Sequence, residues 1–237
     1  VNKYKFVISR RDSFSVFLLE TTVIMKYKYL LIFLLFYSIL SSAQESKKGI
    51  LNVKKIGFLY NNANEHNFLF NDLDYNYTTD TYKLQAFYNL GKWKSLDFEL
   101  TIQPQYQVIK HQLINEQFVL PSEENYQEKR TEFTTPKTIH LYAFELGFLI
   151  KKQLLKKLDF IVTIGLGLAT IDTKTERLAK GFTFIENGSL GLSYQTSKKT
   201  FLYLGSNIGH VSNFDTKKPN NGYSFLGFEI GISYSIK

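Results

Sequence analysis

Apolar and polar residues alternate with a period of two along most of the chain, which is the pattern of a β-strand with one apolar face. The segment 222–236 is the clearest case, because its even positions are mostly large and apolar and its odd positions are mostly glycine, serine and glutamate. Segments 96–109 and 158–170 follow the same parity. No stretch after residue 43 shows a convincing 3.6-residue apolar stripe, so the pattern predicts an all-β protein.

Eight segments of this kind follow one another along the chain. They are 55–61, 81–90, 96–109, 138–152, 158–170, 182–195, 199–210 and 222–236. Their connections alternate in length: three are short (91–95, 153–157 and 196–198) and four are long (62–80, 110–137, 171–181 and 211–221). Outer-membrane barrels have short periplasmic turns and longer extracellular loops. The pattern therefore predicts an eight-stranded antiparallel up-and-down transmembrane β-barrel.

A soluble barrel of the lipocalin type would also show eight alternating strands, but with the apolar face inward. Here the other face is rich in glycine and serine, which suits the narrow interior of an eight-stranded barrel. We therefore expect the apolar face to contact lipid in a bacterial outer membrane. Such a barrel is too narrow for an aqueous channel, and inner charges such as Lys83, Glu145 and Glu229 are expected to be paired.

Residues 25–43 have the pattern of a secretory signal peptide. Met25 is followed by two lysines, by the apolar run 30–40 and by a Ser-Ser-Ala sequence that ends at residue 43. The apolar run is shorter than the about 20 residues of a transmembrane helix, and the small residues suit a cleavage site. We expect an outer-membrane barrel domain over 44–237, whereas 1–24 look like sequence upstream of the true start and receive no function.

Composition narrows the function classes. The chain has no cysteine, which excludes disulfides and the common CxxC metal and redox motifs. Residues 44–237 contain 23 Lys and Arg against 19 Asp and Glu, a net charge of +4, and the lysine pairs fall at predicted turns, so no nucleic-acid partner is expected. Three histidines are scattered along the chain and are expected on the surface: His66, His111 and His140. Neither a metal site nor a cofactor is predicted.

The segment 199–210 carries residues that point to catalysis. Its even positions have the lipid-facing parity and end at His210, and two residues further lies Ser212. If the strand runs on that far, the imidazole and the hydroxyl share one face within hydrogen-bonding reach. A serine hydroxyl is a poor nucleophile until an adjacent imidazole takes its proton, so the pair suggests a serine hydrolase. The long 211–221 connection places the pair at the extracellular end, beside outer-leaflet lipid.

A His-x-Ser pair is a weak signal by itself, because polar residues are common at the rim of a barrel. The longer string His210-Val211-Ser212-Asn213, followed by Pro219-Asn220-Asn221-Gly222, resembles the lipid A 3-O-deacylase (acyloxyacyl hydrolase-like) family of outer-membrane barrels. The resemblance implies an esterase with its active site on the outer wall of the barrel. Its substrate would be an ester-linked acyl chain of lipid A in lipopolysaccharide, and its chemistry would need no cofactor.

The resemblance also implies roles for single residues. Ser212 is expected to be the nucleophile and His210 the general base. Asn213, Asn220 and Gly222 are expected to position the substrate or to help provide oxyanion donors, although asparagine also forms turns well.

The family glutamate that orients the histidine is missing, because its position is occupied by Ser224. Antiparallel pairing across the tight turn at 196–198 places Glu186 opposite His210 or Ile208, on the same lipid-facing side. We therefore expect Glu186 to accept the ring N–H of His210. The alternative for Glu186 is an interfacial carboxylate exposed to lipid headgroups.

A different function remains open for the whole chain. A non-catalytic small barrel would serve as a membrane scaffold, or as an adhesion surface through its 110–137 loop. The expected surroundings are outer-membrane lipid in both cases, and the sequence does not indicate an oligomeric state.

Overall fold

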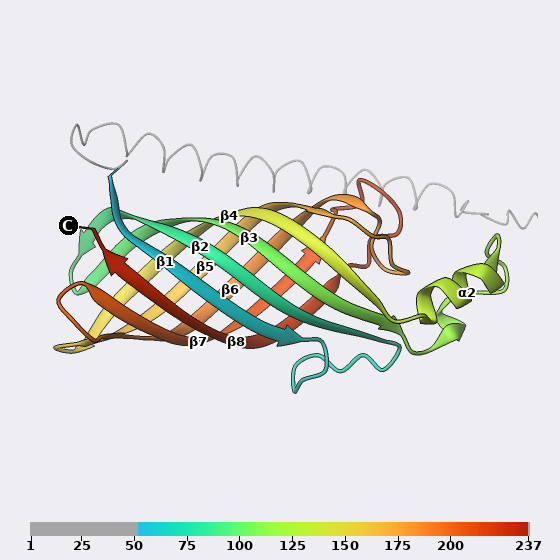
Figure 1. The fold of residues 1–237 in the computed structure, drawn as a ribbon, viewed down its shortest axis with the longest axis horizontal. Coiled ribbons are helices and arrows are strands. Elements are labelled where there is room, and N and C mark those ends of the chain that lie inside the picture. Colours follow the sequence, from blue (N-terminus) through green and yellow to red (C-terminus); the bar gives the residue numbers. More distant parts are fainter. Residues whose placement is uncertain (1–51, 237) are drawn as a thin grey trace, which may run out of the picture. The chain divides into compact units, whose positions relative to one another are not determined.

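The computed structural model describes residues 52–236, which form a closed eight-stranded antiparallel barrel (Figure 1). Strand order follows chain order, and β8 pairs back onto β1. The predicted fold is thereby confirmed, whereas the segments 1–24 and 25–43 lie outside the described residues. The strands are β1 (Val53–Asn64), β2 (Tyr75–Trp93), β3 (Leu96–Leu113), β4 (Lys137–Leu155), β5 (Leu158–Ile171), β6 (Gly181–Gln195), β7 (Thr200–Ser212) and β8 (Tyr223–Ser235).

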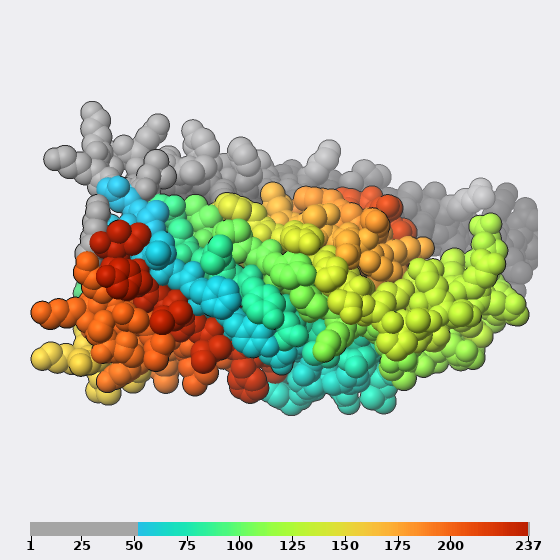
Figure 2. All heavy atoms as spheres, viewed as in Figure 1, coloured from blue at the N-terminus to red at the C-terminus, as the bar shows by residue number. Residues whose placement is uncertain are grey.

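The loops alternate in length as predicted, with long connections at the end of the barrel opposite to the carboxyl terminus (Figure 1). The longest, 114–136, contains η1 (Glu116–Phe118) and α2 (Tyr126–Thr134) and projects beyond the barrel wall (Figure 2). The sequence pattern did not reveal α2, because its buried residue is Phe133 and its other side chains form no apolar stripe. No helix within 52–236 has the length and hydropathy to cross a membrane.

Side-chain polarity divides the barrel into two zones along its axis. In the lower zone, toward the short turns, large apolar side chains cover the outer wall, among them Leu84, Phe148, Ile164, Leu166, Leu190, Leu204, Ile230 and Ile232. In the upper zone the apolar side chains lie inside and are buried, among them Tyr75, Tyr77, Ile109, Leu113, Ile139, Leu141, Ile171, Ile185, Val211, Tyr223 and Phe225. The lower zone suits lipid outside, and the upper zone suits water outside.

The reversal of polarity explains why the strands β2 and β3 were predicted to be too short. β2 begins at Tyr75 rather than 81, and β3 ends at Leu113 rather than 109. In these extensions large apolar side chains, Tyr75, Tyr77 and Leu113, occupy buried inner positions, beside the polar Thr79 and His111. The expectation of a small, polar interior therefore holds around Glu145 but is wrong for the upper zone, and in the lower zone it also misses a smaller buried cluster of Phe87, Leu149 and Ile161.

A row of tyrosines lies on the outer wall close to the reversal. The ring of Tyr82 lies 5.5 Å from that of Tyr60 and 6.4 Å from that of Tyr106, whose ring lies 5.1 Å from that of Tyr142. Tyrosine is enriched where a membrane meets water, because its ring is apolar and its hydroxyl is polar. The row thus indicates the edge of the outer leaflet.

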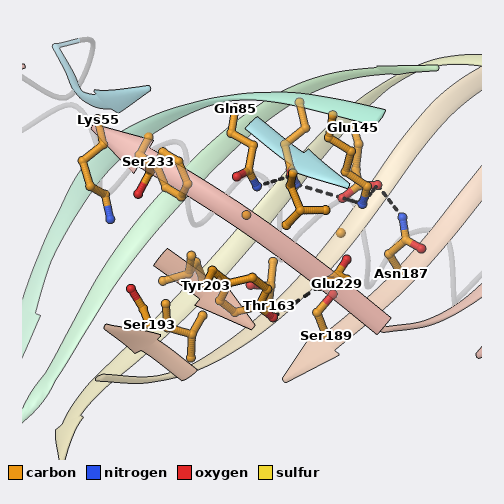
Figure 3. A pocket seen from close by; sticks show the side chains of 18 of the residues that line it. Lys55, Gln85, Glu145, Thr163, Asn187, Ser189, Ser193, Tyr203, Glu229 and Ser233 are labelled. Atoms are coloured by element: carbon orange, nitrogen blue, oxygen red, sulfur yellow. Dashed lines mark hydrogen bonds and ion pairs between the residues drawn. The ribbon is translucent and has the colours of Figure 1, made fainter. Parts of the chain in front are cut away.

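The interior of the lower zone holds a polar network around a cavity (Figure 3). Glu145, which is 1% exposed, accepts hydrogen bonds from Gln103 (2.9 Å), Gln105 (3.2 Å) and Asn187, and Lys83 Nζ lies 3.3 Å from its Oε2. The predicted pairing of Lys83 with an inner acid is confirmed. A buried carboxylate with these partners is stabilised against the cost of leaving water.

Replacing Lys83 by methionine should destabilise the barrel, because it leaves the buried Glu145 without its counter-charge. The free energy of unfolding, measured by urea titration in lipid vesicles, should fall by about 3 kcal/mol. The double variant Lys83→Met/Glu145→Gln should recover much of this loss. Lys92→Met is the matched control, because Lys92 is exposed beside Asp97, and an effect of equal size there would contradict the interpretation.

Candidate functional site

The upper end of β7 carries His210 and Ser212 on the outer wall. The strand extends to Ser212, so the two side chains share the side on which Ile208 faces lipid. Val211 between them is fully buried inside the barrel. His210 is half-buried and Ser212 is 8% exposed. The pair therefore lies where the lipid-facing wall ends and the upper zone begins.

The imidazole of His210 is held on one side by Ser224. The two residues are paired across β7 and β8, and His210 Nδ1 lies 2.9 Å from Ser224 Oγ. With Nδ1 engaged, Nε2 is the ring nitrogen left to take a proton from a nucleophile. In the part of the chain that the structure describes, Ser212 Oγ forms no hydrogen bond with the His210 ring. Hydrogen bonds between a nucleophile and its base often tighten only when substrate is bound.

Glu186 lies on the other side of His210. Of the two registers predicted, the structure has the one that pairs Glu186 directly with His210 across β6 and β7. Glu186 is exposed on the outer wall, and the described residues include no hydrogen bond between its carboxylate and the imidazole. The row Glu186, His210, Ser224 thus crosses three neighbouring strands, and the role of Glu186 stays a prediction.

Asn213 and Asn220 close the loop that follows β7. Asn213 is fully buried, its backbone N–H donates to Asn220 Oδ1 at 2.6 Å, and its Nδ2 donates to the carbonyl oxygens of Lys217 (2.7 Å) and Pro219 (3.4 Å). These bonds fold residues 213–220 into a compact turn beside Ser212. The oxyanion role expected for Asn213 and Asn220 stays a prediction.

Gly222 packs directly against the catalytic candidates. Its φ is +64°, and a Cβ placed on it would lie 2.2 Å from Val211 O and 3.1 Å from His210 Nε2. Both the backbone conformation and the lack of space therefore require glycine. Its place in the Pro-Asn-x-Gly string has a physical reason, because a Cβ here would collide with the backbone of Val211 and press on the His210 ring.

Arg177, in the loop between β5 and β6, supports the candidate site but was not identified from the sequence. Its Nε donates to Gly222 O at 2.9 Å, and its own carbonyl oxygen accepts the N–H groups of Asn221 (2.8 Å) and Gly222 (3.1 Å). Its Nη1 lies 3.1 Å from Asp72 Oδ2 in the loop between β1 and β2. Arg177 thus ties three long loops together around Gly222. A single arginine in a loop has no sequence signal for such contacts.

Glu65, just after β1, supports Ser224 from inside the barrel. Its Oε1 accepts the backbone N–H of Ser224 at 3.1 Å and the hydroxyl of Tyr75 at 2.9 Å. Burial raises the pKa of the Glu65 carboxyl to about 7. Ser224 is therefore positioned by its pairing with β7 and by this carboxyl.

The prediction that His111 lies on the surface is wrong. It is buried in the upper zone, where its Nε2 lies 3.0 Å from the Glu176 carboxylate. A lone histidine in an alternating strand gives no warning that the polarity of the barrel has reversed around it. Residues 52–236 contain no group of three or more side chains suited to hold a metal ion.

Replacing Gly222 by alanine should push the backbone at Val211 aside, and with it the neighbouring His210 ring, while the barrel still folds. A displacement of about 1 Å in a catalytic group costs about a hundredfold in rate. Ester hydrolysis by the purified barrel in detergent micelles measures this loss. Gly91→Ala is the control, because Gly91 also has a positive φ (130°) but lies at the opposite end with nothing within 4 Å of its added Cβ. Equal activity of both variants would contradict the positioning role of Gly222.

Comparison with known proteins gives a family and similar structures. The profile of the lipid A 3-O-deacylase (PagL) family matches residues 65–233. The crystal structure of the outer membrane enzyme PagL is 14% identical and covers 77% of this chain and 99% of its own, with a TM-score of 0.46. Neisserial surface protein A is 13% identical and covers 77% of this chain and 96% of its own, with a TM-score of 0.45. No curated protein sequence matches the chain.

Proposed function

The chain belongs to the lipid A 3-O-deacylase (PagL) family, whose activity is the hydrolysis of an ester bond, and we propose that it removes an ester-linked acyl chain from lipid A in the outer membrane. The observation that carries the proposal is the position of His210 and Ser212. They lie side by side on the outer wall where the lipid-facing surface ends. The acyl esters of a glycolipid lie at this depth, between the sugar and the hydrocarbon.

In the proposed reaction, Ser212 Oγ attacks the ester carbonyl carbon and His210 Nε2 takes the hydroxyl proton. The tetrahedral intermediate breaks its bond to the sugar oxygen, which receives the proton from His210. The acyl group then remains on Ser212 as an ester. A water molecule repeats the sequence, with His210 taking its proton, so that a fatty acid leaves and Ser212 regains its hydrogen.

The negative oxygen of the tetrahedral intermediate needs hydrogen-bond donors. We assign this task to the loop 213–222, which begins directly after the nucleophile and contains Asn213, Asn220 and Gly222. The bonds between Asn213 and Asn220 hold this loop against the end of β7. Donors on a loop that is fixed in advance need little reorganisation during the reaction.

Two side chains share the task of the missing family glutamate in this proposal. Ser224 Oγ accepts the Nδ1–H of His210, which fixes the ring orientation and leaves Nε2 as the base. Glu186, directly opposite His210, supplies the negative charge that stabilises the imidazolium. The Ser224 hydroxyl has no charge, so it cannot stabilise the imidazolium in this way.

Replacing Ser212 by alanine should abolish the activity. Mass spectrometry of lipid A from cells that express the wild-type chain should show the loss of one acyl chain, and the Ser212→Ala variant should leave lipid A intact. Ser206→Ala is the matched control, because Ser206 lies on the same strand and the same outer face, and its activity should be retained. Identical lipid A with and without the wild-type chain would favour the non-catalytic scaffold.

Replacing Glu186 by glutamine should lower kcat by about tenfold or more and leave KM little changed, because charge stabilisation acts in the transition state. Ser224→Ala should also lower kcat, because the ring loses its fixed orientation. Asp80→Asn is the control, since Asp80 is a carboxylate on the outer wall of β2, away from His210. A Glu186→Ala variant that folds and deacylates like the wild type would overturn the assignment of Glu186.

A further inference from the structure

The two ends of the barrel differ in charge. The four long loops, taken as the residues between the strands, together contain 7 lysines and arginines and 11 aspartates and glutamates. The three short turns contain five lysines and no acidic residue. These turns are 94–95, 156–157 and 196–199. The extracellular end therefore has an excess of negative charge, whereas the turns of the periplasmic end are basic.

The carboxylates near the short turns leave most of these lysines without a counter-charge. Asp97 lies 3.8 Å from Lys92 Nζ, Glu99 lies 3.0 Å from Lys55 Nζ, and Asp159 lies on the inner face of β5. Within the described part of the chain, six exposed lysines at this end have no carboxylate partner. We call them the lysine rim: Lys94, Lys152, Lys156, Lys157, Lys198 and Lys199.

Large apolar side chains border the lysine rim at each turn. Trp93 is 62% exposed, and Lys94 Nζ lies 4.8 Å from the centre of its ring. Leu155, the last residue of β4, is 66% exposed. Lys199 Nζ lies 5.9 Å from the centre of the exposed ring of Tyr234. Apolar and aromatic side chains of this kind lie at the boundary of the hydrocarbon, while lysines extend their ammonium groups to the headgroups.

From this arrangement we infer that the lysine rim binds the headgroups of anionic phospholipids in the inner leaflet of the outer membrane. Side chains of the turns 156–157 and 196–199 project beyond the end of the barrel (yellow and orange in Figure 2), where such headgroups lie. The ligand is a lipid rather than a soluble anion, because the apolar border of the rim contacts hydrocarbon at the same time. The inference is independent of the proposed function, since the rim lies at the end of the barrel opposite to Ser212.

The selectivity has an electrostatic basis. A lysine beside an anionic membrane surface contributes a free energy that corresponds to about fivefold in binding. A zwitterionic phospholipid has a phosphate but also carries its own cation, so it gains little from a lysine. The attraction is screened by salt, because the Debye length falls to about 3 Å at about 1 M. Contact with anionic headgroups at the rim, together with the row of tyrosines at the other interface, holds the barrel at a fixed depth.

The fluorescence of Trp93 tests the inference, because Trp93 is the only tryptophan of the chain and lies beside Lys94. The barrel is refolded into vesicles in which either phosphatidylglycerol or phosphatidylcholine is brominated near its headgroup, since bromine quenches tryptophan at short range. The two quenching curves give the ratio of the association constants of the anionic and the zwitterionic lipid at Trp93. This ratio should be about five at low salt and fall to about one at about 1 M salt.

Lys94→Gln/Lys152→Gln should lower the ratio toward one at low salt. Lys94 is the neighbour of Trp93, and Lys152 pairs with Leu96, which pairs with Trp93. Lys94→Arg/Lys152→Arg keeps both charges and should keep the wild-type ratio. All of these side chains are exposed, so the variants should fold, which a heat-dependent mobility shift in gel electrophoresis checks.

Two controls show whether the effect belongs to the lysine rim. Lys110→Gln/Lys180→Gln removes two exposed lysines at the extracellular end and should leave the ratio at Trp93 unchanged. Trp93→Phe/Tyr82→Trp moves the fluorescent residue to the row of tyrosines at the other interface, where the ratio should be about one.

Three results would overturn the inference. The first is a ratio of about one for the wild type at low salt. The second is a ratio that Lys94→Gln/Lys152→Gln leaves unchanged in the folded barrel, or that the controls at the extracellular end lower equally. The third is an equal preference for the anionic lipid at Tyr82→Trp, which would show an attraction to the whole barrel rather than to the lysine rim.

Discussion

The closed ring of backbone hydrogen bonds is the constraint on which the rest of the structure depends. In hydrocarbon no water can satisfy an unpaired N–H or C=O group, so β8 must pair back onto β1. Closure fixes the register of every strand, and a shift by one residue would turn each side chain to the other wall. The outward position of His210 and Ser212 and the inward position of Glu145 therefore follow from the same set of bonds.

The sequence predicted the features that depend on parity. Alternation along β7 placed His210 and Ser212 on one face, and the short turn after β6 placed Glu186 opposite His210 or its neighbour Ile208. Parity could not show that the upper zone inverts, because Tyr75 and Tyr77 look like outward residues when the interior is assumed to be polar. Arg177 and Glu65 act through contacts between distant loops, which no local pattern encodes. His111 was misplaced because of the inversion of the upper zone, and α2 was missed because its side chains form no apolar stripe.

The candidate site combines a rigid wall with tied loops. The strands give His210 two fixed neighbours, Glu186 and Ser224, while Gly222 closes on its ring from the loop. Arg177 holds Gly222, and Glu65 holds the backbone of Ser224. The position of the His210 ring thus depends on three long loops at once, and the residues that hold it lie far apart in the sequence.

The buried apolar core of the upper zone also restricts the route by which a lipid can reach the candidate site. Tyr77 stacks on Tyr223 at 4.4 Å inside the barrel, and the surrounding side chains fill the lumen at this height. Nothing the size of a lipid can pass along the barrel axis. In the proposed reaction, the lipid substrate therefore arrives by two-dimensional diffusion within the outer leaflet, and the released fatty acid leaves by the same lateral route. The encounter rate is then set by the surface density of the lipid rather than by its concentration in water.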